Sequence, residues 1–205
     1  MGSVEAEATL PSVETTLSIE DRIDNSSLVK KLRADPTQNE SRPHAFFPPS
    51  AAWRNLIANT LIGPGMIEVA PYIWTQKEEQ TLTMIFPVGN NMCGHPGIIH
   101  GGFSASIFDE ALARCAFPVL PNKVGATASL QIDYKKPVMA NQILVLKARV
   151  TEVSGRKAWV EGLIESLNEG DDAEEGASVP LVTAKGLFVE PRNSFALEST
   201  YRLDA

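Results

Sequence analysis

A carboxylate in an otherwise small and apolar segment is the first feature of this sequence that points to chemistry. Residues 101–117, GGFSASIFDEALARCAF, have the spacing of a helix and contain Asp109 and Glu110. Glu110 has Arg114 four residues later, a spacing that allows an ion pair on a helix surface. The helical neighbours of Asp109 are small or apolar apart from Ser106, so burying its charge without a partner would be costly. Asp109 is therefore either held by hydrogen bonds or faces a cavity in which it acts as a base or nucleophile.

The start of the same helix has features that suit an oxygen atom of a ligand. Gly101 and Gly102 follow His100 and leave the backbone open to close approach. The first N–H groups of a helix have no partner within it, and the helix dipole adds partial positive charge there. These groups suit a carbonyl oxygen or an oxyanion. Two glycines before a helix are common, but their combination with His100 and Asp109 is more specific.

The segments on either side of this helix have the patterns of strands and would position it. Two strand-like segments precede it and four follow, at residues 66–76, 80–88, 125–137, 142–155, 156–168 and 181–191. Their alternation favours an antiparallel sheet, and SGRK at 154–157 predicts a tight hairpin turn. This order predicts an α+β fold in which a sheet buries the helix on one face.

The length and composition allow one domain with an added segment. The chain has 205 residues and is 43% hydrophobic, which is typical of a globular protein with a sizeable core. Residues 1–50 are acidic and polar at first and rich in Pro later, so we predict an N-terminal extension that is partly disordered or irregular, with short helices within 18–35. Residues 51–205 form the predicted folded domain.

Charge and composition exclude several classes of protein. The net charge of -7 argues against binding to nucleic acid or an anionic membrane surface, and the chain has no apolar run of about 20 residues that would span a bilayer. Two cysteines without zinc-ligand spacing indicate a reducing compartment and no metal site. The N-terminal 24 residues resemble neither a secretory signal nor an Arg-rich transit peptide. We therefore expect a cytoplasmic protein, with mitochondria as the alternative.

Three blocks of the sequence resemble the hotdog-fold thioesterase superfamily: HGGFSASIFDEALA, TASLQIDYKKP and VSGRKAWVEGLIES. The similarity covers roughly residues 66–190 and is strongest to the branch of acyl-coenzyme A thioesterases that includes the mammalian thioesterase superfamily members. It implies a hotdog fold, with an antiparallel sheet wrapped around one long central helix. It also implies a homodimer or a dimer of dimers with active sites at the subunit interface. The first 50 residues match no family pattern.

The resemblance assigns four residues to catalysis of thioester hydrolysis. By position, Asp109 would be the nucleophile or the general base that activates water, and the Gly102 N–H would polarise the thioester carbonyl. His100 would shape the loop and bond the carbonyl or the glycine backbone. Thr127 of the partner subunit would help place the water or the carboxylate. A thioester is a reactive acyl donor, so the reaction needs no metal or cofactor.

Further residues are candidates for binding the substrate, which we expect to be acyl-coenzyme A or another acyl thioester. Gly101 and Asn91 lie in or near the loop before the helix, although Asn in a turn is ordinary. Basic residues at strand ends could contact the phosphates of coenzyme A, and the simpler reading is that they are solvated: Lys135, Lys136, Arg156 and Lys157.

Two other functions remain open, because fold does not settle function. Hotdog dehydratases and hydratases, or another enzyme of a biosynthetic acyl intermediate, are one alternative. Such dehydratases usually set a His against a carboxylate, whereas this chain has three His and none on the central helix. A non-catalytic acyl binder is the other alternative, and it would need no aspartate at position 109.

Overall fold

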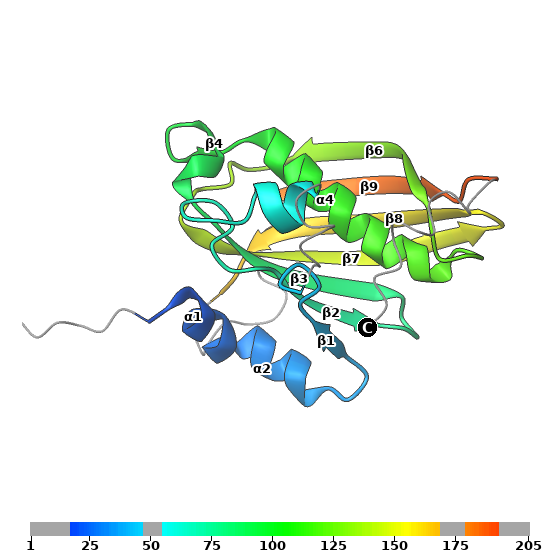
Figure 1. Ribbon diagram of the computed structural model, residues 1–205, viewed down its shortest axis with the longest axis horizontal. Helices are drawn as coiled ribbons and strands as arrows, with labels where there is room; N and C mark the ends of the chain where they lie inside the picture. The colour runs from blue at the N-terminus through cyan, green and yellow to red at the C-terminus, as the bar shows by residue number, and fades with distance from the viewer. Residues whose placement is uncertain (1–16, 47–54, 169–178, 193–205) are drawn as a thin grey trace, which may run out of the picture.

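The computed structural model describes residues 17–46, 55–168 and 179–192. In these residues a long helix, α4 (Gly101–Ala116), lies across one face of an antiparallel sheet (Figure 1). The sheet has seven strands in the order β1-β2-β3-β7-β8-β9-β6. Its strands are β1 (Asn39–Ser41), β2 (Tyr72–Gln76), β3 (Thr81–Val88), β6 (Ala126–Tyr134), β7 (Gln142–Ser154), β8 (Lys157–Ser166) and β9 (Val182–Val189). The protein is thus α+β with the hotdog arrangement, as the sequence predicts.

Smaller elements connect the sheet to the helix. The loop before α4 forms a two-stranded hairpin of β4 (Cys93–His95) and β5 (Ile98–Ile99), and the short helix η2 (Asn90–Met92) precedes it. A π-helical turn, η1 (Leu56–Thr60), lies before the sheet strand β2, and a 3-10 turn, η3 (Phe117–Val119), follows α4. No described helix is both long enough and apolar enough to cross a membrane.

Helix α4 packs closely against the sheet over two glycines. Phe108 and Leu112 are fully buried between the helix and the strands. Gly162 of β8 and Gly186 of β9 lie directly beneath Leu112: a Cβ atom at either position would come within 2.9 and 3.2 Å of its methyl groups. The large inner side chain of Leu112 therefore fits over two glycines in the sheet, and this match fixes the depth of α4.

The long apolar run in β7 reflects burial on both faces of the sheet. Leu144 and Leu146 point into the core beneath α4, whereas Ile143 and Val145 belong to a second core on the outer face. From Lys147 onward the outward-facing side chains are exposed and charged. The switch from a continuous apolar run to alternation marks the point where a second layer stops covering the sheet.

That second layer is made by the N-terminal extension, which is more regular than the sequence predicts. Helices α1 (Ile19–Asn25) and α2 (Ser27–Ala34) begin at serine caps and pack Ile23 and Val29 into the outer core. Strand β1 then joins the sheet beside β2, which the sequence did not predict. Residues 1–16 and 47–50 of the predicted extension lie outside the described residues.

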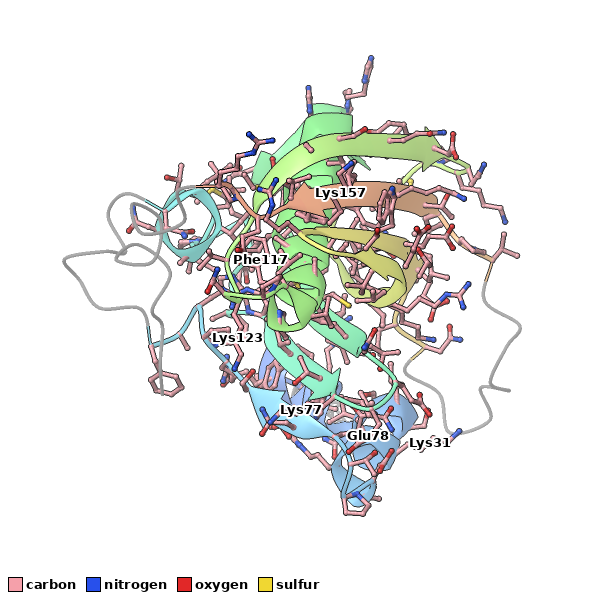
Figure 2. All side chains as sticks on the ribbon, turned by 90° about the vertical axis from the view of Figure 1, so that its right-hand side faces the viewer. Lys31, Lys77, Glu78, Phe117, Lys123 and Lys157 are labelled. Atoms are coloured by element: carbon pink, nitrogen blue, oxygen red, sulfur yellow. The ribbon has the colours of Figure 1, made fainter. Side chains whose placement is uncertain are left out.

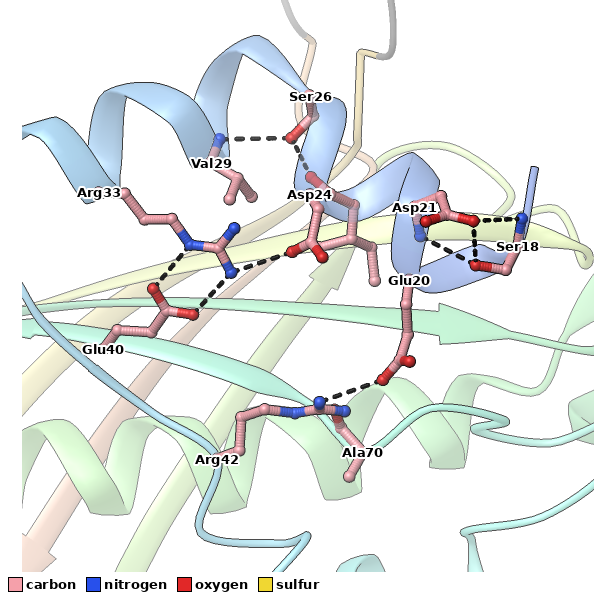
Figure 3. Close-up of polar contacts among 11 residues, drawn as sticks. Ser18, Glu20, Asp21, Asp24, Ser26, Val29, Arg33, Glu40, Arg42 and Ala70 are labelled. Atoms are coloured by element: carbon pink, nitrogen blue, oxygen red, sulfur yellow. Dashed lines mark hydrogen bonds and ion pairs between the residues drawn. The ribbon is translucent and has the colours of Figure 1, made fainter.

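Arginines hold the extension together and tie it to the domain. Arg33 of α2 forms two hydrogen bonds of 2.8 Å with Glu40 of β1 and contacts Asp24 at 2.9 Å (Figure 3). Arg42 contacts Glu20 at 3.1 Å and donates to the Ala70 carbonyl at 3.1 Å. The extension is therefore part of the same folded unit as the sheet.

Candidate active site

The candidate carboxylate has a hydrogen-bond partner on the edge strand of the sheet. The Thr127 hydroxyl on β6 donates to Oδ1 of Asp109 on α4, at 2.6 Å. Asp109 is half-buried rather than fully enclosed, so it is open to water on one side. The pairing of β6 with β9 shifts register between Thr127 and Ser129, and such bulges re-aim side chains. The helix itself offers Asp109 no hydrogen-bond partner. The partner comes instead from this bulge in β6.

The origin of Thr127 differs from what the resemblance implies. The expectation assigned this hydroxyl to a partner subunit, whereas in the structure Thr127 and Asp109 belong to one chain. Strand β6 is the edge of the sheet and runs beside α4, so the two side chains meet within a single subunit. This pair therefore needs no second copy to form.

His100 occupies the helix N-terminus. It is the N-cap residue of α4, and its Nδ1 accepts a hydrogen bond of 2.9 Å from the Gly102 N–H. An accepting Nδ1 carries no proton, so a neutral imidazole here is protonated on Nε2. The bond to the glycine backbone is one of the two contacts expected of His100. A ligand oxygen would share or replace this acceptor.

Tyr134 contacts the same turn and was not identified from the sequence as a site residue. Its hydroxyl donates to the Gly101 carbonyl at 2.8 Å. A Cβ atom at Gly101 would come within 3.1 Å of the Tyr134 hydroxyl oxygen, so the missing side chain makes room for the tyrosine. The only sequence signal was its place in the block IDYKKP that carries the resemblance.

Glu110, next to Asp109 in the sequence, is bound by two other side chains and does not face the candidate site. Arg114 Nε donates to Glu110 Oε1 at 2.6 Å, which confirms the predicted ion pair, and the fully buried side chain of His44 contacts the same oxygen at 3.0 Å. Burial raises the pKa of Glu110, but the His44 hydrogen bond and the Arg114 charge outweigh it and lower this pKa to about 2. Glu110 is thus an ionised anchor between α4 and the segment after β1. Sequence reasoning missed His44 because 66 residues separate it from Glu110.

Asn91, a candidate for substrate binding, makes contacts with a neighbouring loop. Its side-chain amide donates to the Pro64 carbonyl at 3.1 Å, and its backbone N–H donates to the Gly65 carbonyl at 2.7 Å. A Cβ atom at Gly89 would lie 2.4 Å from the Gly65 backbone, so these segments are in close contact. In the structure Asn91 holds two loops together, and its part in substrate binding stays a prediction.

The four basic candidates lie in two separate places. Tyr134, just before Lys135, pairs with Val182 at one end of β9, whereas Lys157 pairs with Val189 at the other end. Seven residues of a strand span about 23 Å. Figure 2 views the end where α4 finishes, with Phe117 and Lys157. A single phosphate group therefore cannot contact both basic pairs of one chain.

Individual contacts further distinguish these basic residues. Arg156 donates to the Glu190 carbonyl at 2.6 Å, and Lys135 lies 3.8 Å from Asp133. Lys136 and Lys157 are exposed.

Other reactive groups in the described residues do not form a second centre. Burial raises the pKa of Cys115 to about 12, so this thiol is neutral. Its sulfur donates to the Gln80 carbonyl at 3.3 Å. Within residues 17–46, 55–168 and 179–192, no group of three or more His, Cys, Asp or Glu side chains could hold a metal ion.

Comparison with known proteins finds thioesterase relatives. The family model described as "Thioesterase superfamily" matches residues 96–172, which include α4 and β6. A Candida albicans protein named "Uncharacterized protein, mitochondrial" is 33% identical over 179 residues, covering 85% of this chain and 77% of its own. The Rattus norvegicus acyl-coenzyme A thioesterase THEM4 is 36% identical over 93 residues, 45% of this chain and 39% of its own. A crystal structure of a thioesterase superfamily protein is 25% identical with a TM-score of 0.48, covering 58% of this chain and 53% of its own.

Proposed function

Because the chain belongs to the thioesterase superfamily, we propose that it hydrolyses acyl thioesters, with acyl-coenzyme A as the substrate. Asp109 acts as the general base or the nucleophile, and the Gly102 N–H binds the thioester carbonyl oxygen. One observation carries the proposal. Thr127 on β6 holds the carboxylate of Asp109, and Asp109 lies on the same helix whose first turn presents Gly102.

The spacing along α4 supports a common site for Asp109 and Gly102. Seven residues make nearly two helical turns, so the two residues lie on one side of the helix, about 10 Å apart along its axis. The Gly102 N–H points out of the helix N-terminus toward His100, so a carbonyl group bound to it lies beyond the first turn. The Asp109 side chain tilts toward the same end of the helix, and the thioester and a water would span the remaining gap.

The proposed reaction uses the two carboxylate oxygens differently. Thr127 occupies Oδ1, which leaves Oδ2 to accept a proton from water. The water oxygen adds to the carbonyl carbon, and negative charge develops on the carbonyl oxygen. The carbonyl re-forms as the C–S bond breaks, and the leaving sulfur takes the proton from Oδ2 and departs as the thiol. A positioned base typically contributes about 10²–10⁴ in rate, and one oxyanion donor about 10²–10³. In the nucleophilic version, Oδ2 itself attacks and water hydrolyses the acyl-enzyme.

The proposed substrate follows from the relative named as an acyl-coenzyme A thioesterase. Its 93 matched residues correspond to 39% of that protein. Coenzyme A carries phosphates, and the exposed basic residues Lys136 and Lys157 lie at opposite ends of the sheet, so one of the two, not both, can contact them within one chain.

We propose that the active form is a homodimer assembled through β6. This strand has nine residues, all at least partly exposed, and in the described residues it pairs on one side only, with β9. A long edge strand with unpaired backbone groups favours pairing with another chain. The candidate site lies along this edge, so a second copy would enclose the open side of Asp109 and exclude water from the acyl chain.

The compartment is part of the proposal. The Candida relative carries "mitochondrial" in its name, which favours the mitochondrial alternative over the cytoplasm for this chain. Imaging of the full chain fused at its C-terminus to a fluorescent protein distinguishes the two compartments.

Replacing Asp109 by Asn tests the proposed function. The amide keeps the shape of the side chain but can neither accept the proton nor attack the carbonyl. We expect hydrolysis of acyl-coenzyme A, measured by thiol release across acyl chain lengths, to fall by about 10³-fold or more in Asp109→Asn. The matched control is Glu78→Gln, the same chemical change in the exposed turn between β2 and β3 (Figure 2), which should leave the rate unchanged.

Two results would reject this function. Full activity in a folded Asp109→Asn variant would remove the aspartate from the mechanism. Wild-type protein that releases no thiol from any acyl-coenzyme A or acyl-carrier-protein ester would favour a dehydratase or an acyl-binding role instead.

A further inference from the structure

We propose that Tyr134 is a positioning residue that orients and polarises the peptide group presenting the oxyanion donor. The inference rests on the proposed function, because it concerns the Gly102 N–H assigned there. Tyr134 is not otherwise needed for the chemistry, and its side chain is 55% exposed. Within the single chain, core packing does not account for a tyrosine that is this exposed and donates into the first turn of α4.

The structure holds a single peptide group from both ends. The carbonyl of Gly101 and the N–H of Gly102 belong to the same planar unit. The Tyr134 hydroxyl donates to this carbonyl at 2.8 Å, and this N–H donates to His100 Nδ1 at 2.9 Å. The plane of the peptide, and with it the direction of the N–H, is therefore set by a chain of two hydrogen bonds.

The same chain of bonds strengthens the donor. A hydrogen bond accepted by an amide carbonyl draws electron density from the amide nitrogen and makes its N–H a better donor, because linked hydrogen bonds polarise one another. The N–H meets little charge on a ground-state carbonyl and more as the thioester oxygen becomes an oxyanion. The contribution of Tyr134 should thus appear in kcat rather than in KM.

The close fit between Tyr134 and Gly101 supports a specific role. A Cβ atom at Gly101 would lie 3.1 Å from the hydroxyl oxygen and 3.2 Å from the tyrosine ring. The ring thus lies over the glycine backbone. Thr127 on the same strand holds Asp109, so β6 positions both the oxyanion donor and the carboxylate.

The test is Tyr134→Phe, which keeps the ring over Gly101 and removes only the donor. We expect kcat for acyl-coenzyme A hydrolysis to fall on the order of tenfold, the effect of one net hydrogen bond, while KM stays within about twofold. We also expect the amide proton resonance of Gly102 in ¹H–¹⁵N spectra to move upfield, since its N–H becomes a weaker donor.

The matched control is Tyr72→Phe, which removes a tyrosine hydroxyl in the outer core. Tyr72 stacks on Trp74 with ring centroids 5.9 Å apart and lies under the Arg42 guanidinium, on the opposite face of the sheet from α4. It should change neither kcat nor the Gly102 resonance.

The outcomes separate the role of Tyr134 from the function of the site. A Tyr134→Phe protein with unchanged kcat, beside an active wild type, would refute the role of Tyr134 and leave the thioesterase function intact. An unmoved Gly102 resonance would refute the coupling between hydroxyl and N–H. A wild type without thioesterase turnover would refute the proposed function, and with it the catalytic meaning of a Gly102 shift.

Discussion

At the scale of single residues, two adjacent carboxylates on α4 have different environments. Asp109 faces the edge strand with one hydroxyl partner and is open on one side. Glu110 faces the other way, into a cluster with Arg114 and His44. One step along a helix rotates a side chain by about 100°, which is enough to place one carboxylate in the site and the other in a structural anchor.

The bond between Thr127 and Asp109 makes a prediction at this scale. Thr127→Val preserves the shape of the side chain and removes the hydroxyl, so the carboxylate loses its orientation. We expect kcat for acyl-coenzyme A to fall by about tenfold, as for the loss of one hydrogen bond to a charged group. Thr127→Ser, which keeps the hydroxyl, should retain most of the activity. Equal kcat values for wild type and the Val variant would show that the hydroxyl does not matter.

At the scale of elements, α4 is anchored on one side by β6 and on the other by the segment after β1. His44 and Arg114 both contact Oε1 of Glu110, and the His44 side chain is completely buried. The extension therefore covers the outer face of the sheet, passes its edge and reaches the helix that carries Asp109. Its position couples the stability of α4 to the extension.

Glu110→Gln should reveal this anchor through its pH dependence. The pKa of Glu110 is about 2 in the folded protein against an ordinary 4.5, so its ionised form stabilises the fold above pH 4.5. That contribution is lost as the pH falls from 4.5 toward 2. We expect urea unfolding at pH 7 to show a loss of roughly 3 kcal/mol in Glu110→Gln, from about 1.4 kcal/mol per pKa unit, and a smaller loss at pH 3.5.

The control for this experiment is Glu161→Gln. Glu161 pairs with Lys185 at 2.7 Å on the exposed face of the sheet, where ion pairs contribute little. Its replacement should change the free energy of unfolding only slightly at either pH. A Glu110→Gln deficit that is the same at pH 7 and pH 3.5 would contradict the ionised anchor.

At the scale of the whole molecule, the two edges of the sheet differ in the length and surroundings of their last strand. On the β2 side the last strand is β1, which has three residues, and α1 and α2 lie next to it (Figure 1), whereas β6 presents nine residues without a partner strand on its outer edge in the described residues. Short edge strands resist pairing with other chains, and long exposed ones invite it. We expect association through the β6 edge, beside the candidate site.

Light scattering tests this association. We expect wild type to have about twice the 22.2 kDa mass of one chain. Gln131→Lys, in the middle of β6, would place like charges close together across a twofold axis and should shift the protein toward the monomer, with reduced thioesterase activity. Ser154→Lys, the same addition of charge at the end of β7, should stay dimeric. A monomeric wild type with full activity would contradict assembly as a requirement.

The sequence by itself determined the elements and the family of this protein. Helical and alternating patterns are local, so they predicted α4, the six strands β2, β3 and β6 to β9, and the Glu110–Arg114 pair without any knowledge of the fold. The short strands β4 and β5 escaped because two or three residues carry too little pattern. The motif HGG with Asp109 pointed to the chemistry because helix termini and unpaired carboxylates have properties that depend on a few neighbouring residues.

Tertiary structure alone decided which distant residues meet these groups. Thr127, Tyr134 and His44 contact α4 from 18, 33 and 66 residues away, and those contacts depend on strand order, on a bulge in β6 and on the path of the extension. Sequence periodicity contains no information on such pairings, because they are selected by packing of the whole chain. For the same reason the sequence predicted short helices within residues 18–35 but not strand β1, nor that this layer covers the outer face of β7.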